Sequence, residues 1–111
     1  MQKNLAPSTI SILHDVATKV VPAGGKVWLY GSRARGDAHE NSDWDLLILL
    51  PQDRITTHDE DAIGYPFVEA GWDIDADVSP QIYTFAEWEQ RETTPFRLNV
   101  ERDKIPVYES E

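Results

Sequence analysis

The first half of the chain alternates between a helical pattern of apolar positions and short aliphatic runs. Apolar residues recur at helical spacing over residues 8–20, and Ser8 or Thr9 can cap this segment, so it is predicted to form a helix. Two apolar runs, residues 26–30 and 43–50, are bounded by glycine or proline and predict buried strands. The second run is almost continuously aliphatic, which places it at the centre of the core.

The second half is less regular. A helix is predicted over residues 57–70, kinked or broken at Gly64 and Pro66. Residues 73–83 alternate apolar and acidic side chains, which predicts a strand that is interrupted or ends near Pro80. The remaining expected elements are a short helix over residues 85–92 capped by Thr84, a helix from Thr94 and Pro95 to about Arg102, and a final strand or tail over residues 105–108.

These elements predict an α/β or α+β fold with a small mixed sheet and helices mainly on one face. With 111 residues, the chain has room for one domain, spanning residues 1–111. We expect functional side chains at the ends of the first two strands, in a site that is open to solvent. A separate domain for binding an acceptor does not fit in this length.

The net charge of the chain limits the kinds of partner that it is expected to bind. Ten Lys and Arg against twenty Asp and Glu give a formal net charge of -10. Such a surface repels polyanions, so nucleic acid is not expected as the main partner, whereas a basic protein or a divalent cation is. The chain has no Cys, which excludes disulfides and thiolate metal sites. It shows no secretory signal and no apolar stretch long enough for a membrane span, so we expect a cytoplasmic protein.

The chemistry converges on the segment between the first two strands. Gly31 follows the first strand, and if Ser32 to Arg35 begin a helix, their free N–H groups form a site for an anion such as a triphosphate. Asp43 and Asp45 are two residues apart on a strand, so both side chains leave the same face and can bind one hard cation. Phosphate groups beside a carboxylate pair are what magnesium-assisted nucleotidyl transfer requires.

Each part of this pattern also has an ordinary structural interpretation. A Gly-Ser pair after a strand is often only a turn, and Asp-x-Asp is often a solvated strand end. Arg33 and Arg35 could neutralise a triphosphate, or Arg35 could pair with Asp37. Either Asp75 or Asp77, on the acidic face of the predicted third strand, could supply a further carboxylate. The three His residues have no metal-ligand spacing and are expected to be structural.

Taken together, these residues resemble those of a known family. Gly31-Ser32, a gap of ten residues, then Asp43-Trp44-Asp45 and an aliphatic strand are similar to the signature of the minimal nucleotidyltransferases of the DNA polymerase β-like superfamily. The resemblance covers roughly residues 8–105. It implies that Gly31 and Ser32 bind the nucleotide phosphates, and that Asp43 and Asp45 hold Mg²⁺, in a site for two ions. It also implies a third carboxylate on the next core strand, at Asp75 or Asp77, with Asp75 aligning slightly better.

The resemblance also implies a biological role. Small members of this family look like the antitoxin of a two-gene system whose toxin is a HEPN ribonuclease, and they can transfer AMP from ATP to a tyrosine of that partner. The leading hypothesis is therefore a protein adenylyltransferase. A non-catalytic binding module with a vestigial nucleotide site is the alternative from another class, and a small-molecule nucleotidyltransferase is the third hypothesis. The choice of adenine depends on the resemblance alone.

Overall fold

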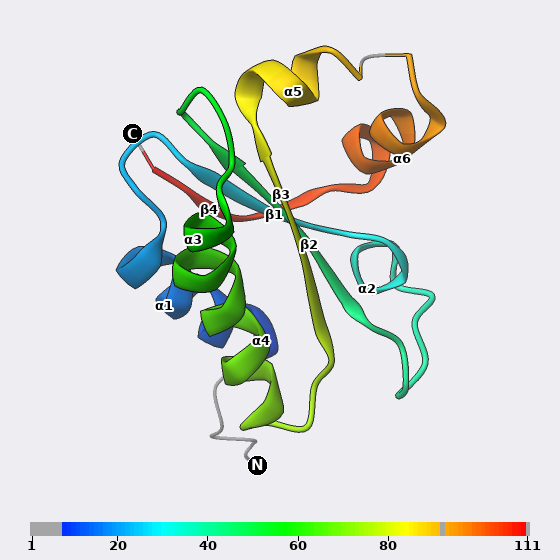
Figure 1. Ribbon diagram of the computed structural model, residues 1–111. Coiled ribbons are helices and arrows are strands. Elements are labelled where there is room, and N and C mark those ends of the chain that lie inside the picture. The colour runs from blue at the N-terminus through cyan, green and yellow to red at the C-terminus, as the bar shows by residue number, and fades with distance from the viewer. Residues whose placement is uncertain (1–7, 92, 111) are drawn as a thin grey trace.

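The computed structural model describes residues 8–91 and 93–110, and it shows a four-stranded sheet with helices packed against it (Figure 1). The strands lie in the order β3-β2-β1-β4. This arrangement confirms the predicted mixed α and β class. In chain order the elements are α1 (Thr9–Val20), β1 (Lys26–Tyr30), α2 (Ser32–Arg35), β2 (Trp44–Leu50), α3 (Thr57–Asp59), π-helix η1 (Glu60–Gly64), α4 (Tyr65–Trp72), β3 (Val78–Thr84), α5 (Phe85–Glu89), α6 (Pro95–Asp103) and β4 (Ile105–Glu109).

The sheet is mixed because its three pairings differ in direction. Strand β1 pairs antiparallel with both β2 and β4, whereas β2 and β3 are parallel. Parallel neighbours need a long crossover connection, and the helical segment α3-η1-α4 supplies it. The crossover leaves β3 at one edge of the sheet and β1 and β2 side by side in its centre.

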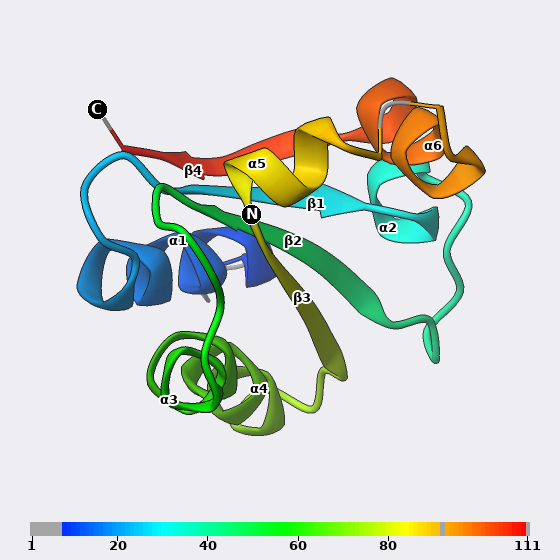
Figure 2. The same ribbon diagram turned by 45° about the horizontal axis from the view of Figure 1, so that its top comes forward.

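Two apolar clusters lie on opposite faces of the sheet. Alternate residues of β2 divide between them, with Leu46 and Ile48 on one face and Leu47 and Leu49 on the other. Helices α1 and α4 cover the larger cluster, and α5 and α6 cover part of the opposite face (Figure 2). The expectation of helices mainly on one face is therefore confirmed, since α1 and the α3-η1-α4 segment contain most of the helical residues.

The first helix, the last helix and the final strand agree closely with the sequence prediction. Ser8 caps α1, because its Oγ accepts the N–H of Ser11 at 3.0 Å. The predicted helix from Thr94 and the final strand are present as α6 and β4. Helix α5 ends at Glu89, and the predicted extension to Glu92 includes a residue outside the described ranges.

The irregularity predicted in the second long helix is present as a π-helical turn. Residues 57–72 stay helical throughout, but Glu60–Gly64 is a π-helix and Pro66 lies in the first turn of α4. The N–H of Tyr65 bonds to the carbonyl of Glu60, five residues earlier, and Pro66 has no N–H with which to continue the ladder, so the irregularity falls where the sequence predicts it. The helix is not broken at Gly64 or Pro66, and it continues past the predicted end at Ala70 to Trp72.

The prediction of a strand over residues 73–83 is wrong at its start. It is also wrong about an interruption near Pro80, because the strand continues through this residue. The backbone carbonyl of Gly71 accepts the N–H groups of Ile74 and Ala76, both at 2.9 Å, and Asp75 has a positive φ of 57°. Residues 73–75 are therefore a turn that follows α4, and residues 76–77 connect this turn to β3, so the alternation of Asp with apolar residues here does not come from a strand. Strand β3 begins at Val78 and runs through Pro80 to Thr84.

None of the helices in the described part of the chain has the length and apolar character needed to cross a membrane.

Candidate active site

The candidate site lies where β1 ends and β2 begins. The antiparallel register pairs Tyr30 with Asp45, so Gly31 and the short helix α2 follow directly beside the carboxylate-bearing start of β2. Figure 2 shows α2 next to the end of β1, on the side of the sheet away from β3. The structure therefore brings the predicted residues together where β1 ends and β2 begins, and Asp43 and Gly36 are exposed to solvent.

Gly31 is in contact with Asp45. Its φ is 75° and its ψ is -159°, a combination that side chains disfavour. A Cβ atom at this position would lie 2.5 Å from Oδ2 of Asp45, far inside van der Waals contact. Only glycine lets the backbone at the start of α2 approach the carboxylate this closely. Gly31 therefore brings the start of α2 next to the carboxylate of Asp45.

The two aspartates differ in environment. Asp43 is exposed, just before β2, while Asp45 is half-buried within it. Burial raises the pKa of Asp45 above its ordinary value, the negative charge of Asp43 raises it further, and the nearby Arg35 guanidinium opposes both effects. A cation bound at the carboxylate pair would oppose this rise in pKa, because a positive charge favours the ionised form of Asp45.

Arg33 is held by the loop that leads to Asp43. Its guanidinium donates to the backbone carbonyl of Ser42 at 3.0 Å and to that of Glu40 at 3.3 Å. It also lies over the Trp44 ring, 4.6 Å from its centroid, and Trp44 packs against the larger core cluster. In this structure Arg33 therefore positions the start of β2, and its predicted role as a phosphate ligand stays a prediction.

Arg35 forms ion pairs with two aspartates, one just after α2 and one on α6. It pairs with Asp37 at 3.1 Å, the alternative raised from the sequence, and with Asp103 of α6 at 3.3 Å. The Arg35 side chain is 41% exposed, so it stays accessible from solvent. The pKa of Asp103 is lowered mainly by its hydrogen bond with Arg102, with Arg35 contributing. Arg35 thus joins α2 to the last helix beside the carboxylates.

The structure separates the two candidates for a third carboxylate. Asp75 is exposed in the left-handed turn before β3, so the strand alternation that favoured it does not apply. Asp77 immediately precedes β3, and its carbonyl accepts the N–H of Trp44 at 2.8 Å, which places its backbone beside Asp43. Across residues 8–91 and 93–110, however, no three His, Asp or Glu side chains gather closely enough to form a metal site.

Two neighbours of the site were missed in the sequence. Tyr30 faces Asp45 across the strand pair, and burial, Asp45 and Tyr83 together raise the pKa of its hydroxyl to about 12. The ring packs edge-on against Phe96 of α6 at 5.6 Å. Asp103, the second partner of Arg35, lies 68 residues further along the chain. Position next to Gly31 could have drawn attention to Tyr30, whereas nothing in the sequence links Asp103 to the site.

Comparison with known proteins identifies the family of the chain. Residues 11–108 match the family described as "Nucleotidyltransferase domain". No curated protein matched the sequence. The fold is similar to that of a toxin-antitoxin with AMP-PNP, at a TM-score of 0.62 and 17% identity over 92% of this chain and 74% of the other.

Two further solved structures share the fold. One is a mutant of the toxin-antitoxin MntA-HpeT, with a TM-score of 0.59 and 15% identity over 95% of this chain and 75% of the other. The second contains a tri-AMPylated Shewanella oneidensis HEPN toxin in complex with MNT antitoxin, with a TM-score of 0.55 and 13% identity over 92% and 71%. At these identities the likeness is one of fold.

Proposed function

Because the chain belongs to the nucleotidyltransferase domain family, we propose that it transfers AMP from ATP to a hydroxyl group of a partner protein in a magnesium-dependent reaction. The observation that carries the proposal is the contact between the Gly31 backbone and the Asp45 carboxylate. That contact joins a backbone segment suited to phosphate with a carboxylate pair suited to a hard cation.

The phosphates are assigned to the start of α2. The first N–H groups of a helical turn have no partner within the helix, and those of Ser32 and Arg33 are in this position. Arg35 adds an accessible positive charge on the same turn. Its existing pairs with two aspartates hold the guanidinium in place beside Asp45, and a phosphate can compete for the exposed part of the group.

The cation is assigned to Asp43 and Asp45. Mg²⁺ is commonly bound by one or two carboxylates together with substrate phosphates and water, so the absence of a three-carboxylate cluster among the described residues does not conflict with this role. When bound, the ion neutralises phosphate charge and lowers the pKa of an attacking hydroxyl. Asp77, adjacent to Asp43 across the parallel strands, is the proposed third carboxylate, and Asp75 is not.

The proposed reaction balances as a simple displacement. The acceptor hydroxyl oxygen forms a bond with the α-phosphorus of ATP, and the bond from that phosphorus to the bridging oxygen of the β-phosphate breaks, so pyrophosphate leaves. The hydroxyl proton passes to Asp77 or to water. Electrostatics favour a protein acceptor, because a chain with a net charge of -10 repels a polynucleotide.

The structural neighbours suggest which protein this acceptor is. They include toxin-antitoxin complexes, one with AMP-PNP and one with an AMPylated HEPN toxin. We propose that this chain acts as the antitoxin of a HEPN-type toxin.

The test is incubation of the chain with Mg²⁺, each α-labelled nucleoside triphosphate and a HEPN-type partner, followed by gel autoradiography and intact mass. We expect the partner to gain AMP units, and the double variant Asp43→Asn with Asp45→Asn to abolish the gain. Asp15→Asn, an exposed aspartate on α1, is the matched control and should leave transfer unchanged. Neutralisation that survives in the double variant, with no labelled protein, would instead identify the chain as a non-catalytic binding antitoxin.

A further inference from the structure

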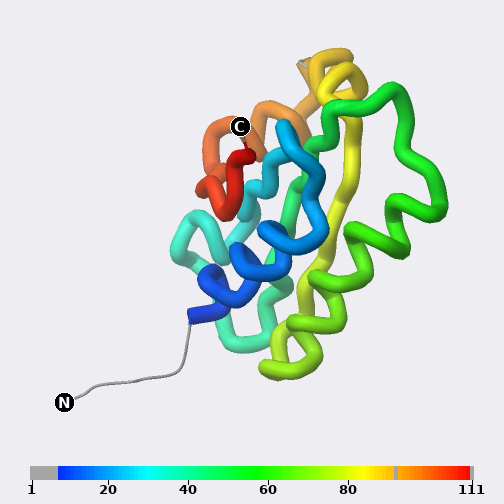
Figure 3. Tube along the Cα trace, turned by 90° about the vertical axis from the view of Figure 1, so that its left-hand side faces the viewer, coloured from blue at the N-terminus to red at the C-terminus, as the bar shows by residue number. Residues whose placement is uncertain are grey.

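The negative charge of the chain is concentrated in the crossover between β2 and β3. Residues 53–77 contain eight Asp and Glu and one Arg, a formal charge of -7 out of -10 for the whole chain. The ion pairs found among residues 8–91 and 93–110 all join residues outside this segment. The helical part of the crossover, in green to yellow-green, lies beside β3 at the edge of the sheet, and only the end of the segment, at Asp77, reaches the nucleotide site (Figure 3).

Exposed aromatic side chains alternate with these carboxylates along one line of the helix. Asp61, Tyr65, Glu69 and Trp72 follow one another at intervals of three or four residues and are all exposed. Tyr65 is 47% and Trp72 57% exposed, and their rings meet edge-on at 5.9 Å. By contrast, Trp28 and Trp88 are buried in the core. Exposed Trp and Tyr are the residues that most often dominate binding between proteins.

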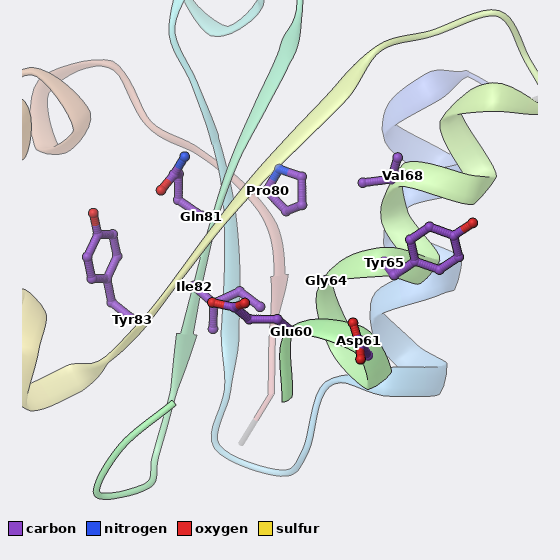
Figure 4. A pocket seen from close by; sticks show the side chains of 9 residues that line it. All are labelled: Glu60, Asp61, Gly64, Tyr65, Val68, Pro80, Gln81, Ile82 and Tyr83. Atoms are coloured by element: carbon purple, nitrogen blue, oxygen red, sulfur yellow. The ribbon is translucent and has the colours of Figure 1, made fainter. Parts of the chain in front are cut away.

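A cavity of about 410 Å³ continues this line toward the sheet edge. Tyr65 and Val68 of α4 line one side, and Pro80 and Ile82 of β3 line the other. Figure 4 shows that side chains from the helix and the strand face this space, with the carboxylates of η1 close by. We call the four-residue line and this cavity the crossover face. It has an apolar floor, aromatic anchors and an acidic rim.

Two occupants are disfavoured by the structure. A second copy of the chain would bring one -7 segment against another, and like charges at an interface are repulsive. An added strand would need hydrogen bonds along the free edge of β3. Successive residues of a strand point their backbone N–H and C=O groups to opposite edges. The carbonyl of Asp77 faces β2, so the backbone of Pro80, three residues later, faces the free edge, where Pro80 offers no N–H.

With these two occupants disfavoured, the crossover face is suited to a positively charged side chain of a partner protein. Arginine fits this face better than lysine does. The guanidinium stacks on Tyr or Trp rings and donates two parallel hydrogen bonds to one carboxylate, whereas the ammonium is a point charge. We propose that the crossover face docks an arginine-bearing segment of the partner protein, so that the partner is held on this face while its hydroxyl is modified elsewhere. The identity of that partner as a HEPN-type toxin rests on the proposed function, but the docking chemistry does not.

The first test uses defined peptides and needs no partner. A synthetic helical peptide of alanine and arginine, and its counterpart with lysine in place of arginine, are titrated into the whole chain by calorimetry. We expect the arginine peptide to bind at least about threefold more tightly, and Glu69→Lys or Trp72→Ala to weaken it about tenfold. Equal affinity for the two peptides, or no effect of either variant, would overturn the assignment.

The second test uses the HEPN-type partner and matched controls on the opposite face. Glu89→Lys changes the charge as much as Glu69→Lys does, at a side chain on α5 that is 71% exposed. Leu98→Ala shortens an apolar side chain that is as exposed as Trp72, at 57%. We expect crossover-face variants to weaken partner binding about tenfold, and the controls to stay within about twofold. Thermal unfolding of each variant checks that it is folded.

Failure of this inference is separable from failure of the proposed function. The double variant Asp43→Asn with Asp45→Asn should lose transfer but bind the partner as wild type does. Crossover-face variants should bind Mg²⁺-ATP normally and raise the KM for the partner without changing kcat. Partner binding that is insensitive to Glu69→Lys and Trp72→Ala, or absent in the wild-type chain, would refute the docking face. Loss of transfer in the aspartate variant would still support the nucleotidyltransferase.

Discussion

Replacing Gly31 with alanine tests whether the approach of the backbone to Asp45 is required for function. The substitution adds one methyl group at a residue with a φ of 75° and a ψ of -159°. Backbone conformations in this nearly glycine-only region cost other residues about 1–3 kcal/mol. The free energy of unfolding of Gly31→Ala should therefore fall by about that amount, measured by urea denaturation.

The second effect of the methyl group falls on the carboxylate. Its position, 2.5 Å from Oδ2 of Asp45, is 0.9 Å inside the 3.4 Å at which ordinary van der Waals contact begins, so that oxygen or the start of α2 has to move by about this distance. Displacements of this order at a reacting centre cost about a hundredfold in rate. We expect AMP transfer to the partner to fall by about that factor, together with weaker binding of Mg²⁺-ATP in calorimetry.

Gly36→Ala is the matched control because it has the backbone cost without the clash. Gly36 also has a positive φ, 86°, but a Cβ there would meet nothing within 4 Å. Its variant should lose about 1–2 kcal/mol of stability and keep its transfer rate. If Gly31→Ala transferred AMP as fast as Gly36→Ala, the contact with Asp45 would have no part in catalysis.

Three further predictions concern stability. Phe67→Ala, which empties a fully buried position between α4 and the sheet, should lower the free energy of unfolding by about 3–5 kcal/mol in urea. Thr84→Ala removes the hydroxyl that accepts the N–H of Glu87 at the start of α5 and should cost about 1 kcal/mol, seen as a lower Tm. The Thr56 N–H lowers the pKa of Asp59, so this stabilisation is present above about pH 4 and is lost as pH falls through the depressed folded value; Asp59→Asn should flatten that part of the acid unfolding curve.

The elements that sequence analysis predicted best are those in which local chemistry and burial agree. Strand β2 is covered on both faces, so its continuous aliphatic run identifies it without any knowledge of its neighbours. Ser8 and Thr94 act through hydrogen bonds to residues three positions away, so capping is visible locally. Local reasoning also predicted that Gly31 and Asp43 lie close together, because the segment between them is short and joins two predicted strands that pair in the structure.

The stretch before β3 shows where local pattern fails. Alternating Asp and apolar residues are compatible with a strand, but the carbonyl of Gly71 captures two N–H groups and turns the chain. Pro80 looked like an interruption because a central strand cannot contain it, and the position of β3 at the sheet edge was not visible. The partner of Arg35 on α6 depends equally on tertiary packing, which brings together residues far apart in sequence.

The anchoring of Arg33 has a consequence for the thermodynamics of ligand capture. Ordering a free loop costs about 1–2 kcal/mol per residue in backbone entropy. The loop before Asp43 is already tied by its own carbonyls to Arg33, and Arg33 is stacked on Trp44. This entropy is therefore lost when the chain folds and not when a nucleotide arrives, so ordering of this loop does not subtract from the free energy of nucleotide binding.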